Sequence, residues 1–206
     1  MRSTPCRAAA AMALMFVGVG GADDAAYQPE TPAALKAQGF EPIFDGKTLA
    51  GWKALDNPDS WSVTPEGTLR GKGPASHLFT VKEYANVEFR AEVRTQPKTN
   101  SGMYFRTKME AGFPAGYEAQ VNCSHRDPVK TGSLYGIAPN RISPHRDNEW
   151  FVQHIVADGD HLVIKVNGKV ITDVHNGKHR KGHLALQQHD PGGLVEYHNL
   201  MVKELP

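Results

Sequence analysis

The sequence predicts a single all-β domain, a sandwich or a barrel, preceded by a short leader. Two observations predict this class. From Gly39 to the C-terminus, no apolar stripe at helical spacing extends beyond about two turns. Instead, short runs that alternate apolar and polar residues lie between Gly, Pro, Asn and Asp turn signals. Alternation with a period of two is typical of strands that bury one face.

Residues 1–22 are predicted to be a cleaved signal peptide. Arg2 and Arg7 make its start basic, a short apolar run follows, and Gly20 and Ala22 provide a small-residue cleavage site. The apolar run is too short to span a bilayer of roughly 30 Å. We therefore expect an exported protein, periplasmic or extracellular, that does not insert into the membrane after cleavage.

Charge and cysteine content narrow the function classes. Removal of 22 of the 206 residues leaves 184, enough for one good core. The remaining 21 Lys and Arg face 22 Asp and Glu, and this balance offers no basic face for nucleic acid. Cys6 leaves with the leader, so Cys123 has no disulfide partner in the chain. Stability must therefore come from burial of a core.

The elements follow in order along the chain. Residues 23–38 are polar and rich in Pro and Ala, and we interpret them as an N-terminal tail or linker with at most one helical turn. The domain occupies residues 39–206. Asn167-Gly168 predicts a two-residue hairpin, because both central residues of such turns need positive φ. The clearest predicted strands are 87–94, 103–107, 116–122, 150–156, 161–166, 169–174, 183–189 and 194–205.

Alternation on three of these strands places polar side chains on one face. In residues 116–122, Tyr117 and the alternate apolar positions belong to the core, so Glu118 and Gln120 point the other way. The same argument applies to residues 100–107 and 183–190. The shared face is predicted to carry Tyr104, Arg106, Glu118, Gln120, Gln187 and His189. Such polar residues on an antiparallel strand are ordinarily solvated, so the pattern alone leaves both a solvated surface and a binding site open.

Seven short stretches occur in a recognisable order. They are FDGKTLAGW at 44–52, NSGMYFR at 100–106, GYEAQ at 116–120, TGSLYG at 131–136, NEWFVQHIV at 148–156, VNGKVITD at 166–173 and HLALQQHD at 183–190. Together they resemble the 3-keto-disaccharide hydrolase domain family, from Gly39 to the C-terminus. The resemblance implies a concanavalin A-like jelly-roll β-sandwich that holds a small sugar substrate on the concave face of one sheet.

The resemblance also implies a reaction. A ketone at C3 of a sugar acidifies the hydrogen on C2, so a base can remove it and the C1 substituent can leave by elimination. Water addition then completes a net hydrolysis. Glu118 is the expected base and His189 the expected acid, with Arg106 or Lys130 holding the developing charge. The expected substrate-binding residues are Tyr104, Arg106, Gln120, His125, Lys130, Tyr135, Glu149, Trp150 and Gln187.

Two other functions remain open from the sequence. A non-catalytic carbohydrate-binding module of the same fold would tolerate the loss of Glu118. A conventional glycosidase would need a second carboxylate about 5–9 Å away, and Glu149 or Asp190 could supply it. Glu118 has no acidic neighbour at a two-residue spacing, unlike the strands of related glucanases. None of the ten histidines shows a zinc-binding spacing, so no metal is predicted and the cofactor stays unknown.

Overall fold

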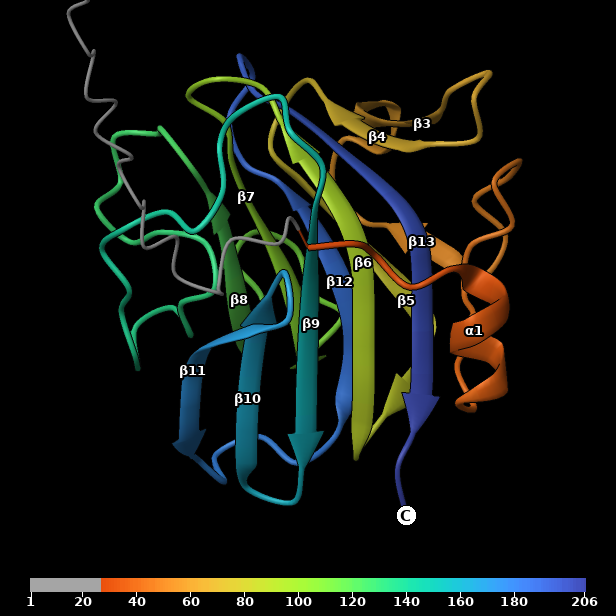
Figure 1. Ribbon diagram of the computed structural model, residues 1–206. Coiled ribbons are helices and arrows are strands. Elements are labelled where there is room, and N and C mark those ends of the chain that lie inside the picture. The colour runs from red at the N-terminus through yellow and green to blue at the C-terminus, as the bar shows by residue number, and fades with distance from the viewer. Residues whose placement is uncertain (1–26) are drawn as a thin grey trace, which may run out of the picture.

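The computed structural model describes residues 27–206 and consists of two antiparallel sheets packed face to face, with one short α-helix at the edge (Figure 1) and a 3-10 turn at Pro58–Ser60. The predicted signal peptide and the first residues of the predicted tail lie outside the described residues. Sequential strands are often not neighbours in the sheets, as in jelly rolls. The predicted all-β jelly-roll sandwich is confirmed.

The larger sheet has eight strands. Its order is β11-β10-β9-β6-β13-β4-β3, and β1 pairs with β13 off this path. The bounds are β1 Glu41–Pro42, β3 Trp61–Val63, β4 Leu69–Lys72, β6 Val87–Thr95, β9 Phe151–Asp158, β10 His161–Val166, β11 Lys169–His175 and β13 Leu194–Glu204.

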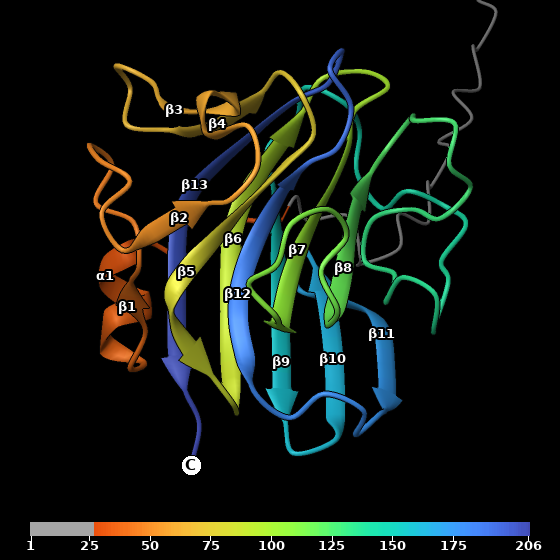
Figure 2. The same cartoon turned by 180° about the vertical axis from the view of Figure 1, so that it is seen from behind.

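The smaller sheet has five strands in the order β2-β5-β12-β7-β8 and lies in front in Figure 2. Its strands are β2 Trp52–Ala54, β5 Ser76–Tyr84, β12 Gly182–Gln188, β7 Asn100–Thr107 and β8 Tyr117–Asn122. One face of this sheet packs on the larger sheet. The other face, here called the outer face, carries the candidate site.

The core lies between the two sheets. Met103 and Phe105 of β7 and Leu184 and Leu186 of β12 are 0% exposed, as their alternation predicted. Burial of such side chains stabilises the fold by roughly 1.5–3 kcal/mol each relative to exposure. Because these residues fix which way each strand faces, the intervening residues are committed to the outer face.

The segment predicted as a tail or linker packs on the domain where it is described. Thr31 caps α1 (Pro32–Ala37), its side chain accepting from the backbone N–H of Ala34. Leu35 is buried with Phe40 and Met201. This segment therefore adds a small satellite core to the domain.

The hairpin between β10 and β11 turns at Asn167-Gly168, with φ of +48° and +76°. This confirms the predicted two-residue turn. Within residues 27–206, no helix has both the length and the apolar character needed to cross a membrane.

Candidate functional site

The outer face of the smaller sheet carries a row of buried polar side chains from four neighbouring strands. The register pairs Tyr104 of β7 with Glu118 of β8, and Gln187 of β12 with His77 of β5. Tyr104, Gln120, Gln187 and His77 are each less than 8% exposed. These four side chains are therefore shielded from water. Because burial of an unpaired polar group costs free energy, they need hydrogen-bond partners within the protein.

A directed chain of hydrogen bonds joins these residues. The Nε2 of Gln187 lies 3.0 Å from the Tyr104 hydroxyl and 3.2 Å from Nε2 of His77. An amide nitrogen can only donate, so both partners accept from it. The Tyr104 hydroxyl proton is then left for Glu118, its other hydrogen-bond partner. The buried Oε1 of Gln187 has no hydrogen-bond partner among the described residues.

Glu118 occupies a space made by a glycine. A Cβ on Gly102 of β7 would lie 2.8 Å from Cγ of Glu118, closer than real Cβ contacts allow. The Glu118 side chain therefore lies directly over the β7 backbone. With the amide nitrogen of Gln120 turned toward it, Gln120 donates to Oε1 of Glu118 at 2.9 Å.

The surroundings of Glu118 favour its neutral form. Burial raises its pKa to about 8, the nearby charge of Asp127 adds to the rise, and the Tyr104 hydrogen bond opposes it. Burial also raises the pKa of Tyr104, which therefore stays a neutral donor. A carboxyl group with a pKa near neutrality is suited to general acid–base catalysis.

His77 is a neutral member of this row. Burial lowers its pKa to about 4, and the nearby His189 adds to this effect. Because Gln187 donates to its Nε2, the His77 proton lies on Nδ1. His77 therefore acts as a hydrogen-bonding group without charge at physiological pH.

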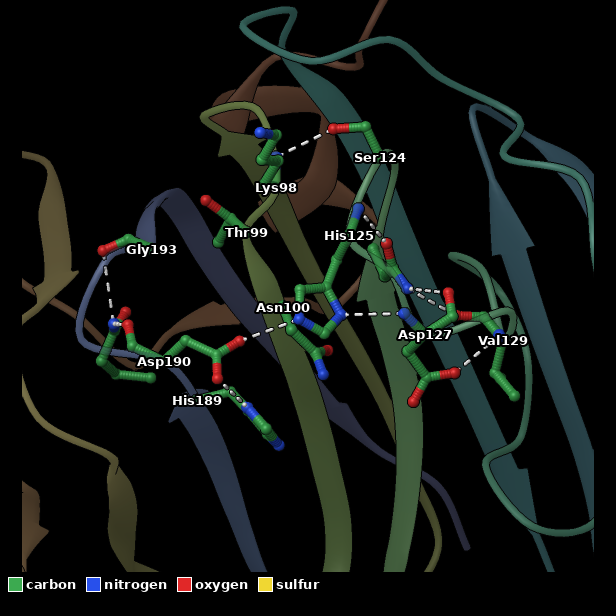
Figure 3. A network of polar contacts seen from close by, with 12 residues as sticks. Lys98, Thr99, Asn100, Ser124, His125, Asp127, Val129, His189, Asp190 and Gly193 are labelled. Carbon is green, nitrogen blue, oxygen red and sulfur yellow. Dashed lines mark hydrogen bonds and ion pairs between the residues drawn. The ribbon is translucent and has the colours of Figure 1, made fainter.

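His125, His189 and Asp190 form a second group, here called the histidine–aspartate cluster (Figure 3). Nδ1 of His189 lies 3.0 Å from Oδ1 of Asp190, and Nε2 of His125 lies 3.1 Å from Oδ2. Both are close contacts between an imidazole nitrogen and a carboxylate oxygen, and the buried Nδ1 of His189 and Oδ2 of Asp190 have no other hydrogen-bond partner among the described residues. The other ring nitrogen of His189 points away from Asp190 (Figure 3).

The tautomer of His125 follows from its neighbours. The backbone N–H of Asp127 donates to its Nδ1 at 3.1 Å, so the neutral ring carries its proton on Nε2, which faces Asp190. Burial lowers the pKa of His125 and favours this neutral form. Asp190 thus orients both imidazole rings from one carboxylate.

A pocket of about 330 Å³ opens beside this face. His77, Gln187 and His189 contribute to its lining, together with Asp56 and Phe113 from two loops. Glu118 is not part of this lining but lies next to it, through the hydrogen-bonded Tyr104 and Gln187. The carboxyl group is therefore linked to the pocket by two hydrogen-bonded side chains.

Arg106 does not belong to the site, and its predicted placement is wrong. Its φ is +49°, and the pairing of β7 with β12 shifts register opposite it, between His183 and Ala185. This bulge breaks the alternation. The side chain is 2% exposed and donates to the carbonyls of Ala85 and Gly159 at 2.7 and 2.6 Å. Arg106 ties loops together in the interior.

Lys130 lies in the loop after β8, where its Nζ donates to the carbonyls of His125 and Asp127 at 2.7 and 2.9 Å. The Lys130 ammonium group therefore stabilises this loop. Because it is already hydrogen-bonded there, it is poorly placed to stabilise a charge on the substrate. Tyr135, 42% exposed, donates to Oδ2 of Asp127 at 2.9 Å. Tyr135 and His125 therefore stand at the rim of the site, as loop residues.

Glu149 and Trp150 lie elsewhere, so their predicted membership of the site is wrong. Both come just before β9, a strand of the larger sheet. The Trp150 ring lies 4.6 Å from the Arg94 guanidinium and 6.3 Å from the His198 ring, on strands of that same sheet. Alternation gives the face of a strand but not the sheet to which the strand belongs.

Sequence reasoning missed four residues of this region: His77, Gly102, Phe113 and, as an orienting group, Asp190. His77 alternates with Leu78, but Phe79 shares its outer face, so this strand is apolar on both sides and shows no clear period. Gly102 pairs with Gln120 and lies diagonal to Glu118 across the two strands, a register that the sequence does not show. Within residues 27–206, no group of three or more His, Cys, Asp and Glu side chains is placed to hold a metal ion.

Residues 39–203 match the 3-keto-alpha-glucoside-1,2-lyase-like domain family. The chain belongs to this family. The resemblance predicted from the seven sequence stretches is thereby confirmed, and the protein is a carbohydrate-active jelly-roll protein. No curated protein matches the sequence significantly.

Solved structures support the same architecture. A glycosyl hydrolase candidate from Parabacteroides distasonis has 21% identity and a TM-score of 0.72, over 83% of this chain and 96% of that one. A carbohydrate-binding module from Bacillus subtilis has 16% identity and a TM-score of 0.60, over 75% and 96%. A β-glucanase from Bacillus licheniformis has 12% identity and a TM-score of 0.57, over 81% and 97%. At these identities the likeness concerns the fold.

Proposed function

We propose that this protein is exported and cleaves 3-keto glycosides by elimination across C1 and C2, followed by addition of water. The observation that carries the proposal is the Glu118 carboxyl group. Its pKa of about 8 and its hydrogen bond from Tyr104 give a base of suitable strength, joined to the pocket-lining Gln187 through Tyr104. Membership of the 3-keto-alpha-glucoside-1,2-lyase-like family supports this reaction class.

The bond changes follow from the ketone. The Glu118 carboxylate takes the hydrogen on C2, and the electron pair of that C–H bond is delocalised onto the C3 oxygen as an enolate. The enolate then collapses, the C1–C2 double bond forms and the C1–O bond breaks. The departing oxygen receives a proton from His189, oriented by Asp190. Water then adds across the double bond, its OH bonding to C1 and its proton to C2. Glu118 releases its proton to solvent and His189 regains one, so both side chains return to their starting forms and no external oxidant or reductant is required.

The enolate oxygen needs a hydrogen-bond donor, and the two cations expected from the sequence are engaged elsewhere. Tyr104 is the donor best placed by its contacts, since its proton already points to Glu118. Once Glu118 has taken the C2 proton, it carries no charge to hold that hydrogen bond. The Tyr104 hydroxyl can then donate to the enolate oxygen, where the charge develops.

A conventional glycosidase mechanism fits these residues less well. That mechanism needs a second carboxylate flanking the bond at about 5–9 Å. The next outer-face residue of β8 is Gln120, Glu149 lies at the larger sheet, and Asp190 contacts two histidines. Asp127 accepts from the Val129 N–H and from Tyr135, which commits both its oxygens.

A non-catalytic sugar-binding module is the second candidate. The fold likeness to a carbohydrate-binding module from Bacillus subtilis favours it, and the buried amides suit sugar hydroxyls. This alternative predicts binding that survives the loss of Glu118. It is therefore separable from the enzyme in one experiment.

The test is product analysis by NMR with 3-keto-trehalose beside trehalose, for the protein and for Glu118→Gln. The proposal predicts release of 3-keto-glucose from the oxidised sugar alone, abolished in the variant. Cleavage of trehalose itself would indicate a glycosidase, and shifts without turnover in both proteins would indicate a binding module. Export is tested separately by N-terminal sequencing of the mature protein, which is expected to begin at Asp23.

A further inference from the structure

Phe113 is a large apolar side chain left exposed at the wall of the pocket. It is 76% exposed and lies in the loop between β7 and β8, which folds over the outer face of the smaller sheet (Figure 2). A single exposed apolar residue is ordinary on a protein surface. Phe113 differs because it shares a pocket with Gln187, and its ring lies 5.9 Å from His189 and 6.5 Å from His77.

The loop that carries Phe113 is braced from both sides. Oδ2 of Asp56 accepts from the backbone N–H of Gly112 at 2.9 Å, and Oε1 of Glu110 accepts from that of Ala115 at 2.7 Å. These contacts hold the backbone next to Phe113, while the ring itself buries little of its surface. The exposed ring therefore contributes little to folding and is held ready for a ligand.

The place of Phe113 in the site indicates which part of the substrate it meets, and this step rests on the proposed function. Glu118, which acts at C2, is not part of the pocket lining, whereas His189, which protonates the departing oxygen, is. The group attached to that oxygen must therefore extend into the pocket. A volume of about 330 Å³ is at the lower end of small-molecule sites, roughly 300–1,000 Å³, and suits one ring.

We infer that Phe113 is the stacking platform for the leaving-group sugar, and is therefore the residue through which the proposed reaction distinguishes a sugar leaving group from a small alkyl group. The C–H face of a pyranose packs on an aromatic ring. Asp56 lines the same pocket, and an ionised carboxylate accepts several hydrogen bonds. It can receive a hydroxyl of that sugar in addition to the Gly112 N–H. An aromatic wall beside a carboxylate matches a sugar ring better than a short alkyl group.

The test compares 3-keto-trehalose with methyl 3-keto-α-glucoside, whose leaving group has no ring. For Phe113→Ala, we expect KM for 3-keto-trehalose to rise about tenfold with kcat nearly unchanged, because one stacking contact is lost. The methyl glycoside should keep its wild-type KM within about twofold. Phe113→Tyr retains the ring and should restore the KM for the disaccharide. The exposure of Phe113 makes loss of folding an unexpected result, and circular dichroism checks it.

The inference and the proposed function fail in different ways. Equal changes for both substrates, or no change for either, would overturn the platform while leaving the cleavage reaction intact. If the wild-type protein cleaves neither substrate, the proposed function fails. In that case the role of Phe113 is tested by saturation-transfer NMR of trehalose binding. Trehalose signals that are lost in Phe113→Ala and kept in Phe113→Tyr would support stacking on Phe113. Signals that neither substitution affects would overturn it.

Discussion

The Glu118 side chain lies over the backbone of Gly102 on the neighbouring strand, and no other residue type at position 102 would leave room for it. A Cβ there would lie 2.8 Å from Cγ and 3.0 Å from Cδ of Glu118. The strand glycine therefore sets the position of the proposed base. Gly102 has no positive φ. A glycine is therefore needed at this position because it leaves space for the Glu118 side chain, and not because of its backbone flexibility.

Gly102→Ala is predicted to displace Glu118 and lower kcat/KM for 3-keto-trehalose about 100-fold, because a shift of about 1 Å at a reacting group has an effect of that size. The substituted protein should remain folded, because the backbone of Gly102 has no positive φ and alanine can adopt it. Gly192→Ala is the matched control, because nothing lies within 4 Å of a Cβ at that position. Steady-state kinetics measure both variants, and wild-type activity in Gly102→Ala would refute this account of the site.

The rate is predicted to depend on pH through Glu118. With a nitrophenyl 3-keto-glucoside, whose leaving group needs no proton from His189, only the base must be in the right form. Because a base must be ionised, kcat/KM for that substrate should rise about tenfold per pH unit and level off above the Glu118 pKa of about 8. The Tyr104 hydrogen bond lowers that pKa, so Tyr104→Phe should move the inflection to higher pH. A pH–rate profile of each protein is the measurement. A rate that falls with pH through this range would make Glu118 the acid instead.

Asp190 is predicted to matter most for poor leaving groups. Asp190→Asn removes the charge that orients His189, which weakens proton delivery to the departing oxygen. We expect kcat/KM for 3-keto-trehalose to fall about 100-fold, within the range for general acid catalysis. A nitrophenyl 3-keto-glucoside leaves without a proton and should lose only about threefold. Equal losses for the two substrates would assign Asp190 a structural role.

Arg106→Ala is predicted to destabilise the fold without removing the chemistry. The guanidinium donates to the carbonyls of Ala85 and Gly159, and these groups would be left buried and unpaired. The free energy of unfolding should fall by about 3–5 kcal/mol, measured by urea denaturation. Arg126→Ala, at an exposed position, is the control. Loss of activity in a stably folded Arg106→Ala would return Arg106 to the site.

Alternation along the strands was enough to predict which face four of the candidate side chains share. Tyr104, Glu118, Gln120 and Gln187 share the outer face because Met103 and its inward neighbours are firmly committed to the core. The period of two holds as long as a strand stays regular. These four side chains could therefore be grouped before any tertiary information was available.

The failures have equally local causes. Arg106 leaves the pattern because one residue adopts positive φ at a bulge, which no periodicity reports. Trp150 was misplaced because it precedes a strand of the other sheet. His77 and Phe113 come to the site through sheet order and a folded loop, contacts between residues distant in sequence. Tertiary structure alone could bring them together.

The central claim, that Glu118 removes the hydrogen on C2, is tested most directly by cleaving 3-keto-trehalose in D₂O. NMR of the released 3-keto-glucose reports hydrogen or deuterium at C2, with enzyme-free product in D₂O correcting for spontaneous exchange. Elimination followed by water addition predicts deuterium at C2 in the wild-type product, and neither release nor exchange with Glu118→Gln. Released sugar that keeps hydrogen at C2 would contradict elimination and indicate direct displacement at C1.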